Sequence, residues 1–184
     1  MIEVEKKFQP TEEQLDSLLK DAIFMGEKTN HDVYYDYPDF RMLKSEIRLR
    51  NRNNSFELKI KKTTGASQEI EDEGDIKKYF KTNLDLKEFV RENLIPIIDY
   101  KTKRKEYRKG EFVIDIDELS FGYKMCEIEI LVETENQIKE AEEKILNLAR
   151  EYNFEFKKIL SKRAEYLRLF KPEIYKEIKG REIE

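Results

Sequence analysis

Charged and apolar residues alternate at every second position in five separate stretches of the chain, and this alternation constrains the fold more than any other feature. The first stretch, MIEVEKKF, places Glu3, Glu5 and Lys7 on one side of a β-strand and mostly apolar residues on the other. The same spacing recurs in EIRLRNR (46–52), FELKIKK (56–62), VIDID (113–117) and CEIEIL (126–131). Each stretch therefore predicts a strand with one charged face and one apolar face.

The charged faces are segregated by sign. One strand offers Arg48, Arg50 and Arg52, others offer only carboxylates, and the first strand offers both signs. Like charges in a row on one face repel each other, so a solvated sheet gains nothing from three consecutive arginines. An anion bound between them would remove this repulsion.

Further strands and several helices complete the predicted set. The pattern predicts strands at 32–37, 46–52, 55–62, 97–109, 111–119 and 123–134, with shorter candidates near 22–28 and 68–72. Hairpin turns are expected at Asn53-Asn54 and at Gly110. Helices are expected at 11–22 with Thr11 as N-cap, at 75–92, at 136–151, and at 161–178 with a break at Pro172.

The amphipathic helices can cover the apolar faces of the strands. The charged faces can surround an anion, and the apolar faces can be covered, if the antiparallel sheet curls into a β-barrel with its charged faces inward and its helices packed outside. We therefore expect an α+β fold, and the absence of repeats or a long linker predicts one domain over residues 1–184.

Composition excludes several classes of protein. The 184 residues contain no run of about 18 apolar residues, so no membrane span is expected. The single cysteine, Cys126, excludes an internal disulfide, and with no apolar run after Lys6 and Lys7 to form a leader we expect a cytoplasmic protein. The net charge of −4, from 36 basic and 40 acidic residues, argues against a nucleic-acid binder.

The mixed lining predicts a site for a metal and a polyphosphate. Guanidinium groups bind phosphate oxygens bidentately, and lysines add positive charge. The carboxylates would repel a polyphosphate unless a hard divalent cation, Mg²⁺ or Mn²⁺, lies between them. A metal that bridges phosphate oxygens neutralises developing charge, and a second metal or a carboxylate can activate water for in-line attack.

Several motifs resemble the CYTH, or triphosphate tunnel metalloenzyme, superfamily. EVEKK (3–7) resembles its Glu-x-Glu-x-Lys signature, and VYYDYPDFRMLKSEIRLRNR resembles its Tyr-Tyr-Asp-Thr-Pro segment leading into Leu-Arg-x-Arg. FELKIKK, TKRKEY, IDIDELSFGYKMCEIEILVE and SKRAEYLRLFKPEIYKEI follow in order and are most similar to the animal thiamine triphosphatases. The resemblance implies an eight-stranded antiparallel tunnel and metal-dependent hydrolysis of the terminal phosphate of a small triphosphate.

The resemblance also implies roles for individual residues. The implied metal ligands are Glu3, Glu5, Asp115 and Glu129. The implied substrate-binding residues are Lys7, Arg50, Arg52, Lys59, Arg104, Glu127 and Lys162. Glu5, Arg52 and Lys7 are expected to carry the catalysis. Lys61 and Asp117 face the same way as their neighbours but are not singled out by the motifs, so they are either supporting or structural.

One difference from the motifs of the animal thiamine triphosphatases bears on the choice of substrate. Animal thiamine triphosphatases carry a tryptophan where this chain has Arg48, and the chain contains no tryptophan at all. An arginine is a poor partner for the cationic thiazolium ring and favours a more anionic substrate such as inorganic tripolyphosphate.

Two other functions stay open: a class IV adenylate cyclase, and a non-catalytic polyphosphate-binding protein. The ligand of the binding protein would be polyphosphate or an inositol phosphate. We expect a small-molecule triphosphate as substrate and neither a membrane nor a nucleic acid as partner. We expect a monomer, with a homodimer as the alternative.

Overall fold

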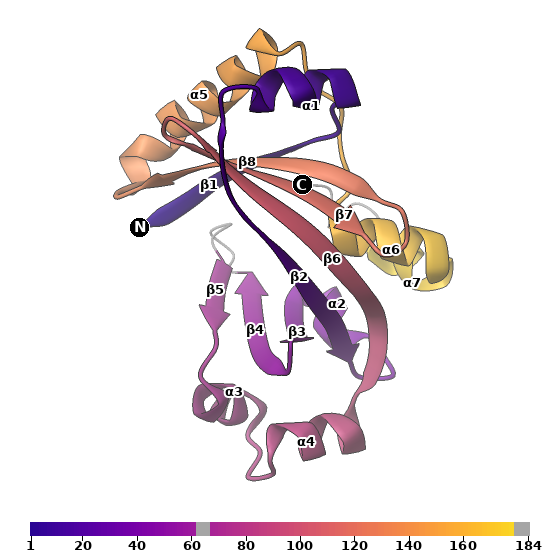
Figure 1. The fold of residues 1–184 in the computed structure, drawn as a ribbon. Coiled ribbons are helices and arrows are strands. Elements are labelled where there is room, and N and C mark those ends of the chain that lie inside the picture. The colour runs from indigo at the N-terminus through magenta and orange to yellow at the C-terminus, as the bar shows by residue number, and fades with distance from the viewer. Residues whose placement is uncertain (62–66, 179–184) are drawn as a thin grey trace. The chain divides into compact units, whose positions relative to one another are not determined.

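The computed structural model of the protein describes residues 1–61 and 67–178, and Figure 1 shows its strands and helices. The strands are β1 (Ile2–Phe8), β2 (Ile23–Asp36), β3 (Ile47–Arg52), β4 (Ser55–Lys61), β5 (Ser67–Ile70), β6 (Ile95–Lys109), β7 (Phe112–Leu119) and β8 (Lys124–Val132). The helices are α1 (Glu12–Leu19), α2 (Arg41–Lys44), α3 (Glu73–Phe80), α4 (Leu86–Asn93), the 3₁₀ turn η1 (Glu135–Gln137), α5 (Ile138–Glu151), α6 (Lys162–Phe170) and α7 (Pro172–Ile178).

The strands form one eight-stranded sheet in the order β1-β8-β7-β6-β2-β3-β4-β5. The described pairings are antiparallel, and the predicted α+β fold with an eight-stranded antiparallel sheet is confirmed. None of the helices within the described ranges has the length and apolar character needed to span a bilayer.

The chain divides into two compact units. The first unit contains Met1–Thr29 and Thr102–Leu160, and the second contains Asn30–Lys101 and the described part of Ser161–Ile183. The long strands β2 and β6 each contribute residues to both units. The prediction of one domain over residues 1–184 stays a prediction.

The core of the first unit lies between its strands and α5. Val4 and Phe8 of β1 and Ile128 of β8 are buried together with Ala141 and Ile145 of α5. Helix α5 packs along β1 and β8 (Figure 1). The apolar face of these strands is thus covered by a helix, as the alternation predicted, and the charged face is the other one.

The core of the second unit lies on the apolar side of β3 and β4. Leu49 and Leu58 are nearly inaccessible to solvent and pack with Ile76 of α3 and with Leu86 and Phe89 of α4. The charged residues of β3 alternate with these core residues and therefore project from the opposite face.

Local sequence explains most element boundaries. Helix α1 begins with a capping box, in which Thr11 Oγ1 accepts from the Gln14 backbone N–H at 3.3 Å and the Gln14 side chain accepts from the Thr11 N–H at 2.8 Å. Both predicted hairpins are present: Asn53 and Asn54 join β3 to β4 with φ of 50° and 73°, and Gly110 follows β6 with φ of 60°.

Three expectations require correction. The predicted strands at 22–28 and 32–37 are one continuous strand, β2, because the polar residues between them keep an extended backbone. The predicted helix at 75–92 is two helices, because Lys81 adopts φ of 54° and ends α3, and Asp85 caps a new helix by accepting from Lys87 N–H at 2.9 Å. The short helix α2 has no counterpart in the prediction, and Lys62, the last residue of the predicted strand 55–62, lies outside the described residues.

Candidate functional site

Carboxylates and cations gather on the charged face of the first unit. The strand register places Glu5 directly opposite Glu129 and Lys7 opposite Glu127. On the next strand pair, Asp115 lies opposite Glu127. Like charges directly opposite each other destabilise a sheet, so the pairs Glu5–Glu129 and Asp115–Glu127 require a neighbouring cation.

Arg104 is one such cation, and it lies at the centre of the acidic cluster. Its Nε donates to Asp117 Oδ1 at 2.7 Å, and its Nη2 donates to Asp117 Oδ2 at 2.6 Å and to Glu127 Oε2 at 2.5 Å. Its Nη1 forms an ion pair with Asp115. The side chains of Asp115, Asp117 and Glu127 are only 4%, 0% and 8% exposed, so Arg104 compensates three buried charges at once.

Lys7 provides a second cation on this face. Its ammonium forms a hydrogen bond with Glu5 and lies 3.9 Å from Glu127 Oε1. Lys6, the preceding residue, points to the other face of β1 and pairs with Glu142 of α5 at 2.7 Å. The two adjacent lysines therefore have different surroundings, and only Lys7 belongs to the acidic cluster.

Two carboxyl groups of the acidic cluster have raised pKa values. Burial, together with Asp117 and Glu127, raises the pKa of Asp115 to about 6, although Arg104 opposes the shift. Burial and the neighbouring Glu3 raise the pKa of Glu129 to about 7. Burial is the larger cause of both shifts, and repulsion from neighbouring carboxylates adds to it.

The four predicted metal ligands, Glu3, Glu5, Asp115 and Glu129, come from β1, β7 and β8 of the first unit. Asp115 Oδ1 is buried and has no hydrogen-bond partner. Carboxylate oxygens are the donors that hard divalent cations prefer, so this donor set fits Mg²⁺ or Mn²⁺ in chemical type. Across residues 1–61 and 67–178, no three acidic, histidine or cysteine side chains stand close enough together to hold an ion as they are now arranged.

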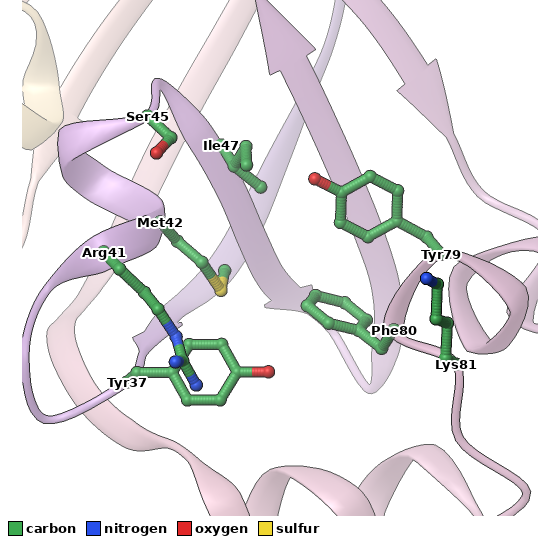
Figure 2. Close-up of a pocket in the computed structure, with 8 residues that line it drawn as sticks. All are labelled: Tyr37, Arg41, Met42, Ser45, Ile47, Tyr79, Phe80 and Lys81. Carbon is green, nitrogen blue, oxygen red and sulfur yellow. The ribbon is translucent and has the colours of Figure 1, made fainter.

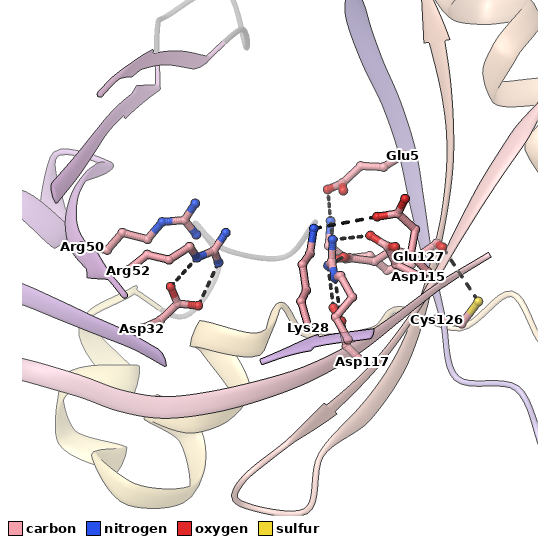
Figure 3. Close-up of polar contacts among 12 residues, drawn as sticks. Glu5, Lys28, Asp32, Arg50, Arg52, Asp115, Asp117, Cys126 and Glu127 are labelled. Carbon is pink, nitrogen blue, oxygen red and sulfur yellow. Dashed lines mark hydrogen bonds and ion pairs between the residues drawn. The ribbon is translucent and has the colours of Figure 1, made fainter. Parts of the chain in front are cut away.

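The charged face of the second unit carries mainly arginines and lysines, and carboxylates on the same face form hydrogen bonds with several of them. Arg52 donates from Nε and Nη2 to the two oxygens of Asp32 at 2.7 and 2.8 Å (Figure 3). Arg50 donates to Glu57, with 2.7 Å between Arg50 Nε and Glu57 Oε2.

The two lysines of β4 are also paired with acids. Lys59 donates to Glu69 at 2.6 Å, and Lys61 lies 3.3 Å from Glu46. Each predicted substrate cation on β3 and β4 is thus held by an acid of its own unit.

The second unit contains one more arginine of interest, which is buried on α6. Arg163 is 7% exposed, and its guanidinium lies 5.9 Å from the centre of the Tyr34 ring. Burial and the nearby Arg48 lower the pKa of Arg163 to about 9. Burial likewise lowers the pKa of Arg48. Lys162, the predicted ligand beside Arg163, is the first residue of α6, which Ser161 caps by accepting from Ala164 N–H at 3.2 Å.

Sequence reasoning missed Asp32, Glu57, Glu69 and Arg163. Glu57 shares the two-residue period of Lys59 and Lys61, so the alternation itself could have identified it. Arg163 lies on a helix beside Lys162, and no periodic signal distinguishes a buried arginine there from an exposed one.

A pocket of about 260 Å³ lies elsewhere on the second unit, between α2, β3 and α3 (Figure 2). Its lining includes Tyr37, Arg41, Met42, Ile47 and Phe80, and the Arg41 guanidinium lies 3.5 Å from the Tyr37 ring centre. Ile47 projects from the face of β3 opposite to the arginines, and the lining contains no carboxylate. This pocket is therefore separate from the charged face.

Comparisons with known proteins find similarity to the thiamine-triphosphatases, the group that the sequence motifs resemble. The chain is 26% identical to the human thiamine-triphosphatase over 207 residues, which cover 97% of this chain and 89% of the human protein. The macaque (Macaca fascicularis) thiamine-triphosphatase matches to the same extent, 26% over 207 residues.

Solved structures share the fold. A Pyrococcus horikoshii protein aligns with a TM-score of 0.58 at 27% identity, over 84% of this chain and 92% of that one. A Hippeastrum protein described as revealing a dominant triphosphatase activity aligns with a TM-score of 0.55 at 16% identity, over 90% of this chain and 94% of that one. The CYTH domain model matches residues 1–166, which confirms the resemblance carried by the motifs. The chain therefore belongs to the CYTH domain family.

Proposed function

We propose that this protein is a metal-dependent triphosphatase that removes the terminal phosphate of a small triphosphate. The observation that carries the proposal is the carboxylate cluster of the first unit, in which Glu5 opposes Glu129 and a buried oxygen of Asp115 has no hydrogen-bond partner. The cationic face of the second unit and the similarity to thiamine-triphosphatases support it further.

The proposal assigns the metal and the phosphates to different residues. The carboxylates of Glu3, Glu5, Asp115 and Glu129 would hold Mg²⁺ or Mn²⁺, and such an ion polarises phosphate oxygens when bound. The proposed phosphate ligands are Lys7, Arg50, Arg52, Lys59, Arg104 and Lys162, and Glu127 is proposed as a further substrate-binding residue. Glu5, Lys7 and Arg52 would contribute most to catalysis: Lys7 and Arg52 would stabilise the negative charge that develops in the transition state, and Glu5 would act as a ligand of the metal.

Arg104 is already engaged by three carboxylates. Each of its nitrogens contacts a carboxylate, so a phosphate oxygen bound by Arg104 would compete with Asp115, Asp117 and Glu127 for its N–H groups. A phosphate oxygen bound by Lys7 would likewise compete with Glu5.

We propose inorganic tripolyphosphate as the preferred substrate and thiamine triphosphate as the second candidate. Arg48 stands where animal thiamine triphosphatases carry a tryptophan, and its charge disfavours a thiazolium cation. Arg48→Trp is expected to lower the ratio of tripolyphosphate to thiamine triphosphate hydrolysis. A wild-type preference for thiamine triphosphate of about two orders of magnitude or more would refute this assignment.

The test measures phosphate released from tripolyphosphate, thiamine triphosphate and ATP with Mg²⁺, with Mn²⁺ and with a chelator. Glu5→Gln and Arg52→Ala are each expected to lower kcat/KM by a factor of about 30 to 1,000, or about 2–4 kcal/mol of transition-state stabilisation. Lys7→Gln should be strongly impaired and Lys6→Gln should not, because Lys6 pairs with Glu142 on the other face of β1.

The other outcomes separate the alternatives. Wild-type rates in the Glu5 and Arg52 variants would refute the site assignment. Conversion of ATP to cyclic AMP would identify a class IV adenylate cyclase, and tight polyphosphate binding without phosphate release would identify a binding protein.

A further inference from the structure

Asp32 has an unusual environment for an aspartate. It lies in β2 directly opposite Arg52 of β3, and its side chain is 2% exposed. Arg52 is the only hydrogen-bond partner of the Asp32 side chain among the described residues. A carboxylate this buried requires a compensating cation, and here one arginine provides all of it.

The contact fixes the orientation of the guanidinium. Nε and Nη2 of Arg52 donate to different oxygens of Asp32, which is the bidentate arrangement that holds the planar group in one orientation. No described residue accepts a hydrogen bond from Nη1 of Arg52, whose side chain remains 32% exposed. The edge of Arg52 that Asp32 does not use therefore stays available to a ligand.

Neither the Arg50–Glu57 pair nor Asp36 combines a deeply buried carboxylate with a bidentate arginine contact. Arg50 donates from Nε and Nη2 to a single oxygen of Glu57, a side chain that is 23% exposed. Asp36, the other buried aspartate of β2, accepts from backbone N–H groups of Tyr37, Met42 and Leu43 and has no arginine partner.

We propose that Asp32 is a positioning residue that locks the Arg52 guanidinium in the orientation needed to bind a phosphate oxygen of the substrate. This inference rests on the proposed function, because it assumes that Arg52 binds a triphosphate. Asp32 itself touches no phosphate and acts through Arg52.

Positioning and simple charge predict opposite results for Asp32→Asn. Removal of a negative charge beside Arg50 and Arg52 would strengthen polyanion binding if charge alone mattered. Loss of the bidentate contact instead lets the guanidinium rotate, and misplacement of such a group by about 1 Å can cost about 100-fold in rate.

The experiment compares Asp32→Asn, Arg52→Gln and the double variant. It measures kcat and KM for tripolyphosphate with Mg²⁺, and the Kd for tripolyphosphate without metal by calorimetry. Asp32→Asn is expected to lower kcat/KM by about 10- to 100-fold and to raise the Kd. The double variant should be no worse than Arg52→Gln alone, because Asp32 has nothing left to position.

Asp36→Asn is the matched control. It also removes a buried carboxylate from β2, so it should lower the free energy of unfolding, yet leave kcat/KM of the folded protein within about two-fold. If Asp32→Asn does not fold, Arg52→Lys replaces it: a lysine keeps the charge but cannot make the bidentate contact, so it should behave like Arg52→Gln.

The results distinguish this inference from the proposed function. Unchanged or tighter tripolyphosphate binding in Asp32→Asn, additive losses in the double variant, or a fully active Arg52→Lys would each overturn the positioning role. A wild-type protein that binds tripolyphosphate but releases no phosphate would overturn the proposed function, and the Kd series would still test Asp32.

Discussion

Replacement of Arg104 by methionine should destabilise the protein strongly and in a pH-dependent way. Methionine keeps most of the side-chain length and removes the cation that contacts Asp115, Asp117 and Glu127. Loss of one partner of a buried ion pair costs about 3–5 kcal/mol, and here three carboxylates lose a shared partner, while Lys7 still lies 3.9 Å from Glu127 Oε1. Because domains are stable by about 5–15 kcal/mol, this loss removes a large part of the total.

The sign of the pH dependence follows from linkage. Arg104 opposes the raised pKa of Asp115, so without Arg104 the pKa of Asp115 in the folded protein lies further above its unfolded value of about 3.9. The folded state then binds more protons than the unfolded state, so stability falls as pH rises through the folded pKa values. Since burial already raises the pKa of Asp115 to about 6 in the wild type, the loss should be largest near pH 8 and smaller near pH 5.

Urea unfolding followed by circular dichroism at both pH values measures this difference. Arg108→Met is the control, because Arg108 lies exposed on the same strand and donates from Nε to the Gly110 carbonyl at 3.3 Å. It should change stability by less than about 0.5 kcal/mol. A loss in Arg104→Met that is small, or equal at both pH values, would show that Arg104 is not the counter-ion of this cluster.

Two further predictions concern groups on opposite faces of β8. Because burial raises the pKa of Glu129 to about 7, the metal-free protein should lose stability as pH rises from about 4.5 to 7, by about 1–2 kcal/mol after allowance for the exposed part of the side chain. In Glu129→Gln, the midpoint of urea unfolding should depend less on pH over that range. An unchanged pH dependence would contradict the assignment of the pKa shift to Glu129. Burial also raises the pKa of the Cys126 thiol, which is inaccessible to solvent, so a thiol reagent should label it far more slowly in the native protein than in urea. Equal rates in the two states would show that the sheet opens readily at β8.

The sequence by itself determined the faces of the strands. Period-two alternation assigned Glu5, Arg50 and Asp115 to charged faces and Ile128 to a core, because successive side chains of a strand point to opposite sides. Turn chemistry at Asn53-Asn54 and Gly110 fixed which strands are adjacent, since both turns need a positive φ that Asn and Gly adopt readily. The motifs then identified the family.

Only the tertiary structure decided which charges meet. The alternation assigns a face but says nothing of register between strands distant in sequence, and the register between β1 and β8 determines that Glu5 lies opposite Glu129 and that Lys7 lies opposite Glu127. Burial of Arg163 likewise depends on how α6 packs beside Tyr34, and no local pattern encodes that contact. Charge type and strand face are properties of single segments, whereas the pairing and burial of a charge depend on long-range contacts that form when the segments assemble.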